Sequence, residues 1–494
     1  MKFSRMCRTN YILFACMVMT VNAVVVAGDD SPRVTVSSVR RVFHNGEHNA
    51  FTDMCRFRGQ LYLTFRSCPD GHMVHPTASI IVLRSNDGEK WQQVHRFHVE
   101  QRDTRDPHCW ENTMARHPMQ FIVPFLAGAV FGTTAQSAGA DDPVVFISAF
   151  EPGDKGAIHA YRLDTATGTL KPIHRTTDVE HPFFLAVSRD QRFLYSINAK
   201  TFGGKEPEQV AAYAIEGRTG RLRLLNRQST RGSASCYLDI DATGKTVLVA
   251  NYSTGSVASL PVNADGSLGE AASFHQHAGS SVDPARQKGP FAHSIVVSPD
   301  NRFAFAADLG LDQVLGYRLN AATAKLTPNE PPFAKTPPGA GPRHLTFLPN
   351  GKHIYVINEL KNSVTMFDYA AASGTLTKRQ TIGTLPADFT GTSYCADLKI
   401  TANGRFLYGT NRGHDSIAAY EIGEDGRLTL MGIEPSLGKG PQNLAIAANG
   451  TLLLCANMPG NNVAVFRIDA KTGSLKSVGE PISMPSPSCI QLLP

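Results

Sequence analysis

A short pattern recurs between residues 190 and 457, and it constrains the fold more than any other feature of this chain. Its clearest half is a turn followed by an apolar strand that ends in Asn or Asp, as in GKHIYVIN (351–358) and GRFLYGTN (404–411). The strand-ending residues are Asn198, Asn251, Asp308, Asn358, Asn411 and Asn457. Between them lie an alternating strand, a turn and a short strand, as in NSVTMFDYAAASGTLT (362–377). Repeats of about 50 residues made of short strands are typical of β-propellers, in which each repeat forms a four-stranded blade.

The order of the strands also predicts how the two ends of the repeat region meet. The first blade begins at VVFISAF (144–150) and lacks an opening strand, while SCIQLL (488–493) stands alone at the other end. We therefore expect an all-β, seven-bladed β-propeller over residues 143–494, closed by pairing of the C-terminal strand with the first blade. Closure of this kind leaves no exposed sheet edges.

Composition excludes several classes of function. The net charge of +6 is mild, and no run of Lys and Arg with interleaved aromatic residues is present, so we expect no nucleic-acid partner. No apolar run is long enough to cross a bilayer, so no stable membrane insertion is expected. The nine cysteines are scattered without a CxxC pair or a Cys/His zinc spacing. We expect neither a metal nor another cofactor.

The N-terminal region contains two segments with the pattern of a signal peptide. In residues 1–28, basic residues precede an apolar stretch from Tyr11 to Val21, and small residues follow. Residues 111–142 repeat this pattern, with an apolar core from Phe121 to Phe131. This second segment is interpreted either as a linker with a buried apolar patch or as a second leader. Both interpretations predict a periplasmic or secreted propeller.

Residues 33–110 predict a small β fragment. The strand ASIIVLR (78–84) leads into SNDGEKW (85–91), which resembles the Asp-box turn of sialidase-like propellers. The resemblance implies that Asp87 caps the turn and that Trp91 packs beneath it. This segment is too short to build a sialidase ring, so we expect no catalytic role for it.

Four residues with ionisable side chains stand at turns whose other residues are mostly small or apolar. His293 and Arg343 precede the first strand of a blade, and Glu359 and Arg412 follow the second strand. These positions lie at one end of a propeller, near its channel. Arginines there suit a carboxylate or phosphate, and His with Glu suits proton transfer. The alternative is that Arg343 and Glu359 are merely an ion pair.

Two further sets of residues accompany these four. His344, beside Arg343, is predicted either to bind substrate or to pack in its turn. The recurring Asn251, Asp308, Asn358 and Asn411 are expected to cap turns and not to catalyse.

With these residues in place, residues 143–494 resemble the seven-bladed lactonase family. That family includes propeller-type 6-phosphogluconolactonases and 3-carboxymuconate cyclases. The resemblance is carried by stretches such as SSVDPARQKGPFAHS (280–294), GAGPRHLTFLPNGKHIYVINEL (339–360) and FLYGTNRGHDSIAAYEI (406–422). It implies an active site made by His293, Arg343, Glu359 and Arg412. Three positions depart from the family's usual residues and are expected to narrow or shift the substrate: Phe291, Gln442 and Ala199.

We therefore predict a lactone hydrolase that opens a sugar or carboxylated lactone, with a small anionic lactone as its partner. Arg343 and Arg412 would hold the anion and the developing oxyanion. His293 and Glu359 would divide the roles of base and acid in an order that the sequence leaves open. Two alternatives remain: a carboxymuconate cyclase-type lactonizing isomerase, or a non-catalytic extracellular binding propeller. Secretion argues against 6-phosphogluconolactone as the substrate, and the oligomeric state is not predicted.

Overall fold

The computed structural model describes residues 17–21, 36–41, 48–57, 60–68, 79–87, 89–98, 142–447 and 450–493. The chain divides into two compact units, residues 1–132 and 133–494. Within the described residues, no helix is long and apolar enough to cross a membrane.

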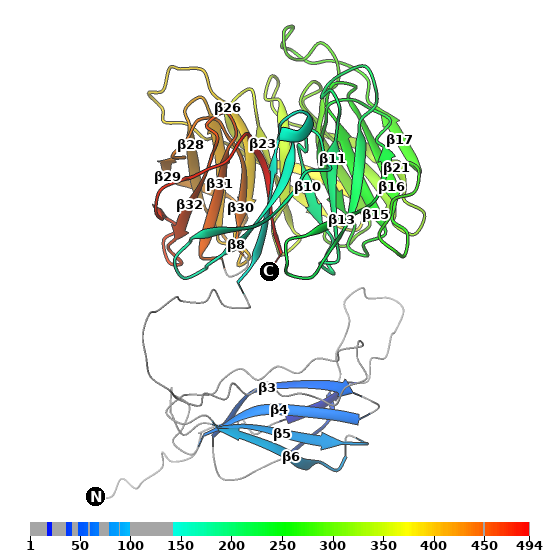
Figure 1. The fold of residues 1–494 in the computed structure, drawn as a ribbon, viewed down its shortest axis with the longest axis vertical. Helices are drawn as coiled ribbons and strands as arrows, with labels where there is room; N and C mark the ends of the chain where they lie inside the picture. Colours follow the sequence, from blue (N-terminus) through cyan, green and yellow to red (C-terminus); the bar gives the residue numbers. More distant parts are fainter. Residues whose placement is uncertain are drawn as a thin grey trace, which may run out of the picture. The chain divides into compact units, whose positions relative to one another are not determined.

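The N-terminal unit contains two small antiparallel sheets. Strand β1 (Met17–Val21) pairs with β2 (Val36–Arg41). A four-stranded sheet, coloured blue in Figure 1, follows in the order β3 (His48–Phe57), β4 (Gln60–Cys68), β5 (Ser79–Ser85) and β6 (Gln92–His98). Of the predicted leader 1–28, only β1 lies among the described residues. Of the second leader-like segment, 111–142, only Asp142 does.

The turn between β5 and β6 has the geometry expected for it. Asp87 Oδ1 accepts hydrogen bonds from the backbone N–H groups of Glu89 at 2.7 Å and Lys90 at 2.9 Å. Trp91 packs against the buried cluster of Leu63, Phe65, Ile81 and Leu83. The predicted capping role of Asp87 and packing role of Trp91 are therefore confirmed.

In its described residues, the second unit is all-β apart from one 3-10 turn, η1 (Gly153–Lys155), and forms seven antiparallel sheets arranged as blades (Figure 1). The strands of the first three sheets are β35 (Pro487–Leu493), β7 (Val144–Ala149), β8 (Ala157–Leu163) and β9 (Leu170–Thr176); β10 (Leu185–Val187), β11 (Phe193–Asn198), β12 (Gln209–Ile215) and β13 (Leu222–Ser229); β14 (Ser235–Ile240), β15 (Thr246–Asn251), β16 (Ser256–Pro261) and β17 (Ser273–Gln276).

The remaining four sheets continue the pattern, with β34 (Ile482–Ser483) added beside β32 in the last one. Their strands are β18 (Ala292–Val297), β19 (Phe303–Asp308), β20 (Gln313–Asn320) and β21 (Lys325–Lys335); β22 (Pro342–Phe347), β23 (His353–Asn358), β24 (Ser363–Ala370) and β25 (Thr375–Gly383); β26 (Tyr394–Ile400), β27 (Phe406–Arg412), β28 (Ser416–Ile422) and β29 (Leu428–Pro435); β30 (Pro441–Ile446), β31 (Leu452–Asn457), β32 (Asn462–Ile468) and β33 (Leu475–Ser477).

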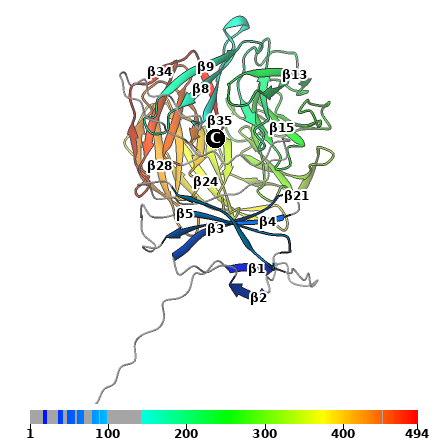
Figure 2. The same ribbon diagram turned by 60° about the horizontal axis from the view of Figure 1, so that its bottom comes forward.

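The blade of β7, β8 and β9 takes its first strand from the end of the chain. β35 pairs antiparallel with β7, with Pro487 opposite Ala149 and Leu493 opposite Val144. Figure 2 shows β35 in the same sheet as β8 and β9, although it comes from the opposite end of the unit's sequence. Each of the seven sheets thus has a first strand, and these first strands face one another around the channel.

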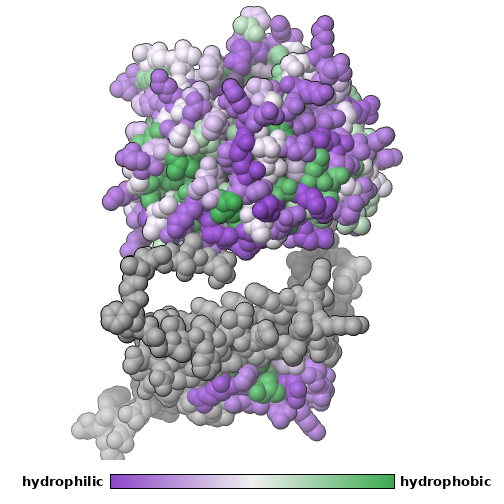
Figure 3. Space-filling view, in the orientation of Figure 1, coloured by the Kyte–Doolittle hydropathy of each residue, from purple (hydrophilic) through white to green (hydrophobic). Residues whose placement is uncertain are grey.

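The core lies between neighbouring blades. Because each blade packs against two others, its middle strands are buried on both faces; β15, β19 and β31 are buried at every position. Phe305 of β19 and Phe367 of β24 belong to one buried cluster that joins two adjacent blades. Outer strands such as β29 are largely exposed. Figure 3 accordingly shows a propeller surface on which hydrophilic residues predominate.

A repeated polar contact joins the blades at the end of the ring where the predicted site residues lie. It is made by a residue with positive φ in the turn after the second strand: Asp312, Asn362, Asp415 and Asn461. Each side chain bonds the loop that enters the next blade's first strand. For example, Asp415 Oδ1 accepts from Gly440 N at 2.8 Å. Asn and Asp tolerate this backbone conformation better than bulkier residues do.

The strand-ending Asn and Asp residues cap turns, as predicted. Asn411 Nδ2, for example, donates to Thr384 O at 2.9 Å and to Ser416 Oγ at 3.1 Å. Asn251, Asn358 and Asp308 likewise bond turn and strand-end groups of their own blades. These buried side chains therefore fix the turns that carry the site.

Replacing Asn411 with Ala is expected to lower the free energy of unfolding by about 2–4 kcal/mol. The substitution removes the hydrogen bond to the buried carbonyl of Thr384, at about 1–3 kcal/mol, and one of the two hydrogen bonds of Ser416 Oγ, which keeps its contact with His414, at about 1 kcal/mol. Chemical denaturation measures the change. Asn403→Ala, in an exposed turn, is the control and is expected to change stability by less than about 1 kcal/mol. Equal effects of the two variants would contradict the assignment.

Candidate active site

The first strands of the blades carry a repeated irregularity at their starts. In five of the seven sheets, the pairing of the first strand with the second shifts around a single residue: Cys236, His293, Arg343, Gln442 and Ser488. A β-bulge turns the extra residue out of the regular alternation, and bulges are common beside active sites for that reason. The fold therefore directs His293 and Arg343 from neighbouring blades toward one end of the channel.

Glu359 lies at the centre of the site and binds three arginines. Its Oε2 accepts from Arg343 Nε at 3.0 Å and from Arg412 Nη2 at 2.8 Å. Its Oε1 accepts from Arg286 Nη2 at 2.7 Å. His293 Nε2 lies 3.8 Å from Oε2. The structure thus brings together all four predicted residues, His293, Arg343, Glu359 and Arg412.

The charges of the site do not cancel. Burial raises the pKa of Glu359, but the guanidinium groups of Arg412 and Arg343 outweigh this effect, so its net pKa is below the ordinary value and the carboxylate is ionised. Burial, and then Arg412, lower the pKa of Arg343 to about 10, which leaves it protonated at neutral pH. Three guanidinium groups therefore face one carboxylate, with a formal charge of +2 among them. Such a site favours an anion.

His293 is neutral at ordinary pH. Burial, followed by the charges of Arg343, lowers the pKa of His293 well below its usual value. The ring also forms a hydrogen bond to its own backbone, and Cys236 Sγ lies 3.5 Å from Nδ1. We assign the proton to Nδ1, which leaves the lone pair of Nε2 on the side of Glu359. A neutral imidazole in this position can accept a proton.

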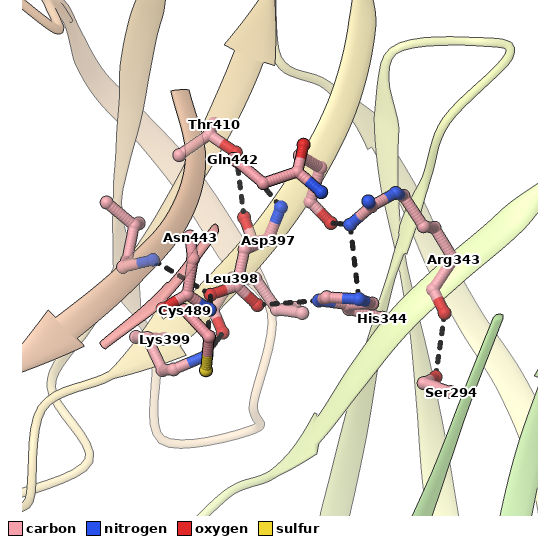
Figure 4. Close-up of polar contacts among 12 residues, drawn as sticks. Ser294, Arg343, His344, Asp397, Leu398, Lys399, Thr410, Gln442, Asn443 and Cys489 are labelled. Atoms are coloured by element: carbon pink, nitrogen blue, oxygen red, sulfur yellow. Dashed lines mark hydrogen bonds and ion pairs between the residues drawn. The ribbon is translucent and has the colours of Figure 1, made fainter. Parts of the chain in front are cut away.

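Behind Arg343 lies a buried polar network, shown in Figure 4. Arg343 Nη1 is 3.1 Å from His344 Nε2, and His344 Nδ1 is 2.8 Å from Asp397 Oδ1. Asp397 Oδ2 also accepts from Lys399 Nζ at 2.7 Å and Asn443 Nδ2 at 2.8 Å. Burial and the charge of Arg343 lower the pKa of His344 to about 3, so the ring stays neutral.

This network leaves His344 little access to a ligand. Its side chain is buried, and protein groups occupy both ring nitrogens. The contacts of His344 indicate that it orients Arg343. Its predicted substrate-binding role stays a prediction.

Two site residues were missed by the sequence analysis. Arg286 comes from the loop before β18, and its only sequence signal is its place in a stretch that carries the family resemblance. Tyr252 packs edge-on against His293, with ring centroids 5.0 Å apart. It directly follows Asn251, just as Glu359 follows Asn358 and Arg412 follows Asn411. That positional repeat could have identified it.

Aromatic rings border the charged groups. Phe291 packs against Tyr252 with ring centroids 4.9 Å apart, and Arg286 lies over the ring of Tyr394, 5.4 Å from its centroid. Phe291 and Arg286 are half-buried, and Tyr394 is exposed. The charged centre is thus flanked by apolar surfaces.

A separate crevice lies away from these residues. This crevice of about 710 Å³ is lined by the turns after β7, β9 and β11, including Asp178, Lys200 and Glu208. It contains none of the clustered site residues, and we place the chemistry at Glu359 because the convergent charges are there. Among the residues that the structure describes, no group of three or more His, Cys, Asp or Glu side chains could hold a metal ion.

Comparison with known proteins agrees with this architecture. A family model described as "Lactonase, 7-bladed beta-propeller" matches residues 144–492. The 6-phosphogluconolactonase of Bacillus subtilis is 32% identical over 350 residues, which cover 70% of this chain and 97% of that protein. The 6-phosphogluconolactonase of Formosa agariphila is 31% identical over 362 residues, 70% of this chain and 99% of that protein.

A solved structure has a similar fold. The periplasmic gluconolactonase of Pseudomonas aeruginosa superimposes with a TM-score of 0.67 and is 32% identical. The similarity covers 71% of this chain and 99% of that one. The sequence relatives and this structure thus match about the same share of the chain.

Proposed function

This chain belongs to the seven-bladed β-propeller lactonase family and is a lactone hydrolase, and we propose that it opens an anionic lactone at the site around Glu359. The observation that carries this proposal is the contact of one buried carboxylate with three guanidinium groups beside a neutral histidine. Acyl transfer needs positive charge where an oxyanion forms and a base near the attacking water. The site offers both.

In the first step, His293 acts as the base. Water attacks the lactone carbonyl carbon while His293 Nε2 takes one of its protons. The carbonyl oxygen becomes an oxyanion, which Arg343 and Arg412 stabilise. Glu359 is a poor candidate for the base because Arg412 and Arg343 lower its pKa, which weakens it as a proton acceptor, and because its oxygens already accept three charged hydrogen bonds. Its role is to hold the arginines in place.

In the second step, the tetrahedral intermediate collapses and the bond between the carbonyl carbon and the ring oxygen breaks. The protonated His293 returns its proton to the departing ring oxygen, which becomes a hydroxyl group. The product is an open-chain hydroxy acid, and His293 is neutral again. In this mechanism one residue serves as base and then as acid, instead of the division of these roles between His293 and Glu359 that was expected from the sequence.

The substrate is a carboxylated or sugar lactone met outside the cytoplasm. The formal charge of +2 among the site's groups supports an anionic substrate. The leader-like segments and the periplasmic gluconolactonase relative support an extracytoplasmic location. The sialidase-like ancestry of residues 33–110 stays a prediction, and the N-terminal sheet takes no part in this mechanism.

The proposal is tested by incubating the purified full-length protein with a panel of lactones, with the matching hydroxy acids and with an unsaturated dicarboxylic or tricarboxylic acid of the muconate type, followed by NMR. Ring opening of at least one carboxylated or phosphorylated lactone is expected. Ring closure of an unsaturated acid without any hydrolysis would favour the cyclase alternative. No reaction in either direction by a folded protein would overturn the assignment of hydrolysis to this site.

The apparent pKa at which kcat/KM falls on the acidic side is expected to be lower than the ordinary pKa of histidine. His293 must be neutral to act as a base, and its pKa is lowered, so activity persists as the pH falls below about 6.5. The groups around it are Glu359, Arg343, Arg412, His344, Tyr252 and Cys236. The pKa values of Glu359 and His344 are lowered and those of Tyr252 and Cys236 are raised, so none of these four groups changes its charge at about pH 6.5. A plot of log kcat/KM against pH measures this fall; an apparent pKa of 7 or higher would contradict this role.

A further inference from the structure

The third arginine of the site differs from the other two in how it is bound. The side chain of Arg286 is 34% exposed, compared with 27% for Arg412 and 1% for Arg343. Among the described residues, its side-chain hydrogen bonds go to Glu359 and Tyr252. Arg343 and Arg412 each also bond backbone carbonyl groups at the start of β26. Arg286 therefore keeps the most donor capacity for a ligand.

The position of Arg286 is fixed despite its exposure. Its guanidinium lies over the ring of Tyr394, and its Nη2 is held by Glu359. An arginine held by a carboxylate and an aromatic ring presents its free edge in a defined direction, which lowers the entropy lost when it binds an anion.

The loop that carries Arg286 is anchored to the loop that leads to Arg343. Gln287, next to Arg286, is buried and donates to Asp312 Oδ1 at 2.8 Å. Asp312 also accepts from Gly341 N at 2.8 Å, two residues before Arg343. One buried carboxylate thus sets the spacing between the two arginine-bearing loops, as a built binding site requires.

We propose that Arg286 determines substrate specificity by binding the carboxylate or phosphate of the lactone through the free edge of its guanidinium. This inference rests on the proposed function and assigns different roles to the three arginines of the site. Arg343 and Arg412 face the oxyanion that forms during the reaction, whereas Arg286 binds a charge that the substrate already carries. Its loss should therefore weaken binding of anionic lactones and spare neutral ones.

The test compares Arg286→Met with the unchanged full-length protein on matched lactones: D-glucono-δ-lactone, which is neutral, D-glucarolactone, which carries a carboxylate, and 6-phospho-D-glucono-δ-lactone. A charge-assisted hydrogen bond supports an expected rise in KM of about 10- to 100-fold for the anionic lactone that the protein hydrolyses. We expect kcat for that lactone and KM for the neutral one to change less than about threefold. Arg286→Lys should recover part of the lost affinity.

Lys288→Met is the matched control. Lys288 is exposed in the same loop, and its replacement removes the same charge without touching Glu359. A KM for anionic lactones that rises equally in both variants would overturn the inference in favour of a general field effect. Equal losses on neutral and anionic lactones would overturn it in favour of a structural role for Arg286.

These outcomes are distinct from failure of the proposed function. If the unchanged protein hydrolyses lactones and the Arg286→Met substitution changes KM equally for neutral and anionic lactones, only the specificity role of Arg286 is wrong. If the unchanged protein hydrolyses none of the three lactones and none of the wider panel, the proposed function itself fails, and the Arg286 inference with it.

Discussion

Glu359→Gln is expected to lower kcat/KM for lactone hydrolysis by about 100- to 1,000-fold, a loss comparable to that of an oxyanion-hole donor. The amide cannot accept charged hydrogen bonds from three guanidinium groups, and its own N–H donors face them. Arg343 and Arg412 then lose the shared acceptor that aims them at the carbonyl oxygen. Steady-state kinetics on the lactone that the unchanged protein hydrolyses measures the loss.

The same variant is expected to be less stable, by about 3 kcal/mol, because removing one partner leaves buried positive charge without its counter-ion. Inorganic phosphate should raise the melting temperature of Glu359→Gln more than that of the unchanged protein, since an added anion replaces the lost carboxylate. Glu421→Gln, at an exposed position of β28, should alter neither activity nor stability noticeably. If Glu359→Gln kept full activity, the carboxylate would have no part in holding the arginines.

His293→Ala is expected to lower kcat by about 100- to 10,000-fold, the range that general base catalysis supplies. KM should change little, because the substrate's charge is bound by arginines and not by the imidazole. Free imidazole added to the variant should restore part of the activity by filling the space of the lost ring. Rapid titration of released acid measures both effects.

His174→Gln provides the matching control. His174 lies on β9, the outer strand of its blade, away from the channel, so its replacement should leave kcat unchanged. A His293→Ala variant that is folded and retains more than a tenth of the activity would show that another group accepts the proton from water.

The repeat made much of the fold and site predictable. Because every blade places equivalent residues at the same end of the ring, Arg343, Glu359 and Arg412 could be assigned to one rim from their positions relative to Asn358 and Asn411. The same reasoning, applied to the residue that follows Asn251, would have identified Tyr252 as a further residue of the site. The contact of His293 with Glu359, 66 positions later in the chain, needed only the assumption that successive blades are neighbours.

The residues that escaped prediction act through contacts that no repeat encodes. Arg286 comes from the loop between β17 and β18, which is longer than the loops that enter the other first strands, and it reaches Glu359 across 73 positions. For His344 the sequence left substrate binding and packing both open, because the contact with Asp397 that orients its ring comes from 53 positions away. The β-bulges that direct His293 and Arg343 to the channel depend on strand register, which the sequence pattern alone does not show.

Whether the site around Glu359 hydrolyses lactones is measured by pH-stat titration of the full-length protein, run in parallel with the Glu359→Gln and His293→Ala variants. Base consumption reports each ester bond opened, without any coupled enzyme. We predict steady consumption with the unchanged protein on an anionic lactone and almost none with either folded variant. Hydrolysis that persists undiminished in both variants would place the active site elsewhere and contradict the account.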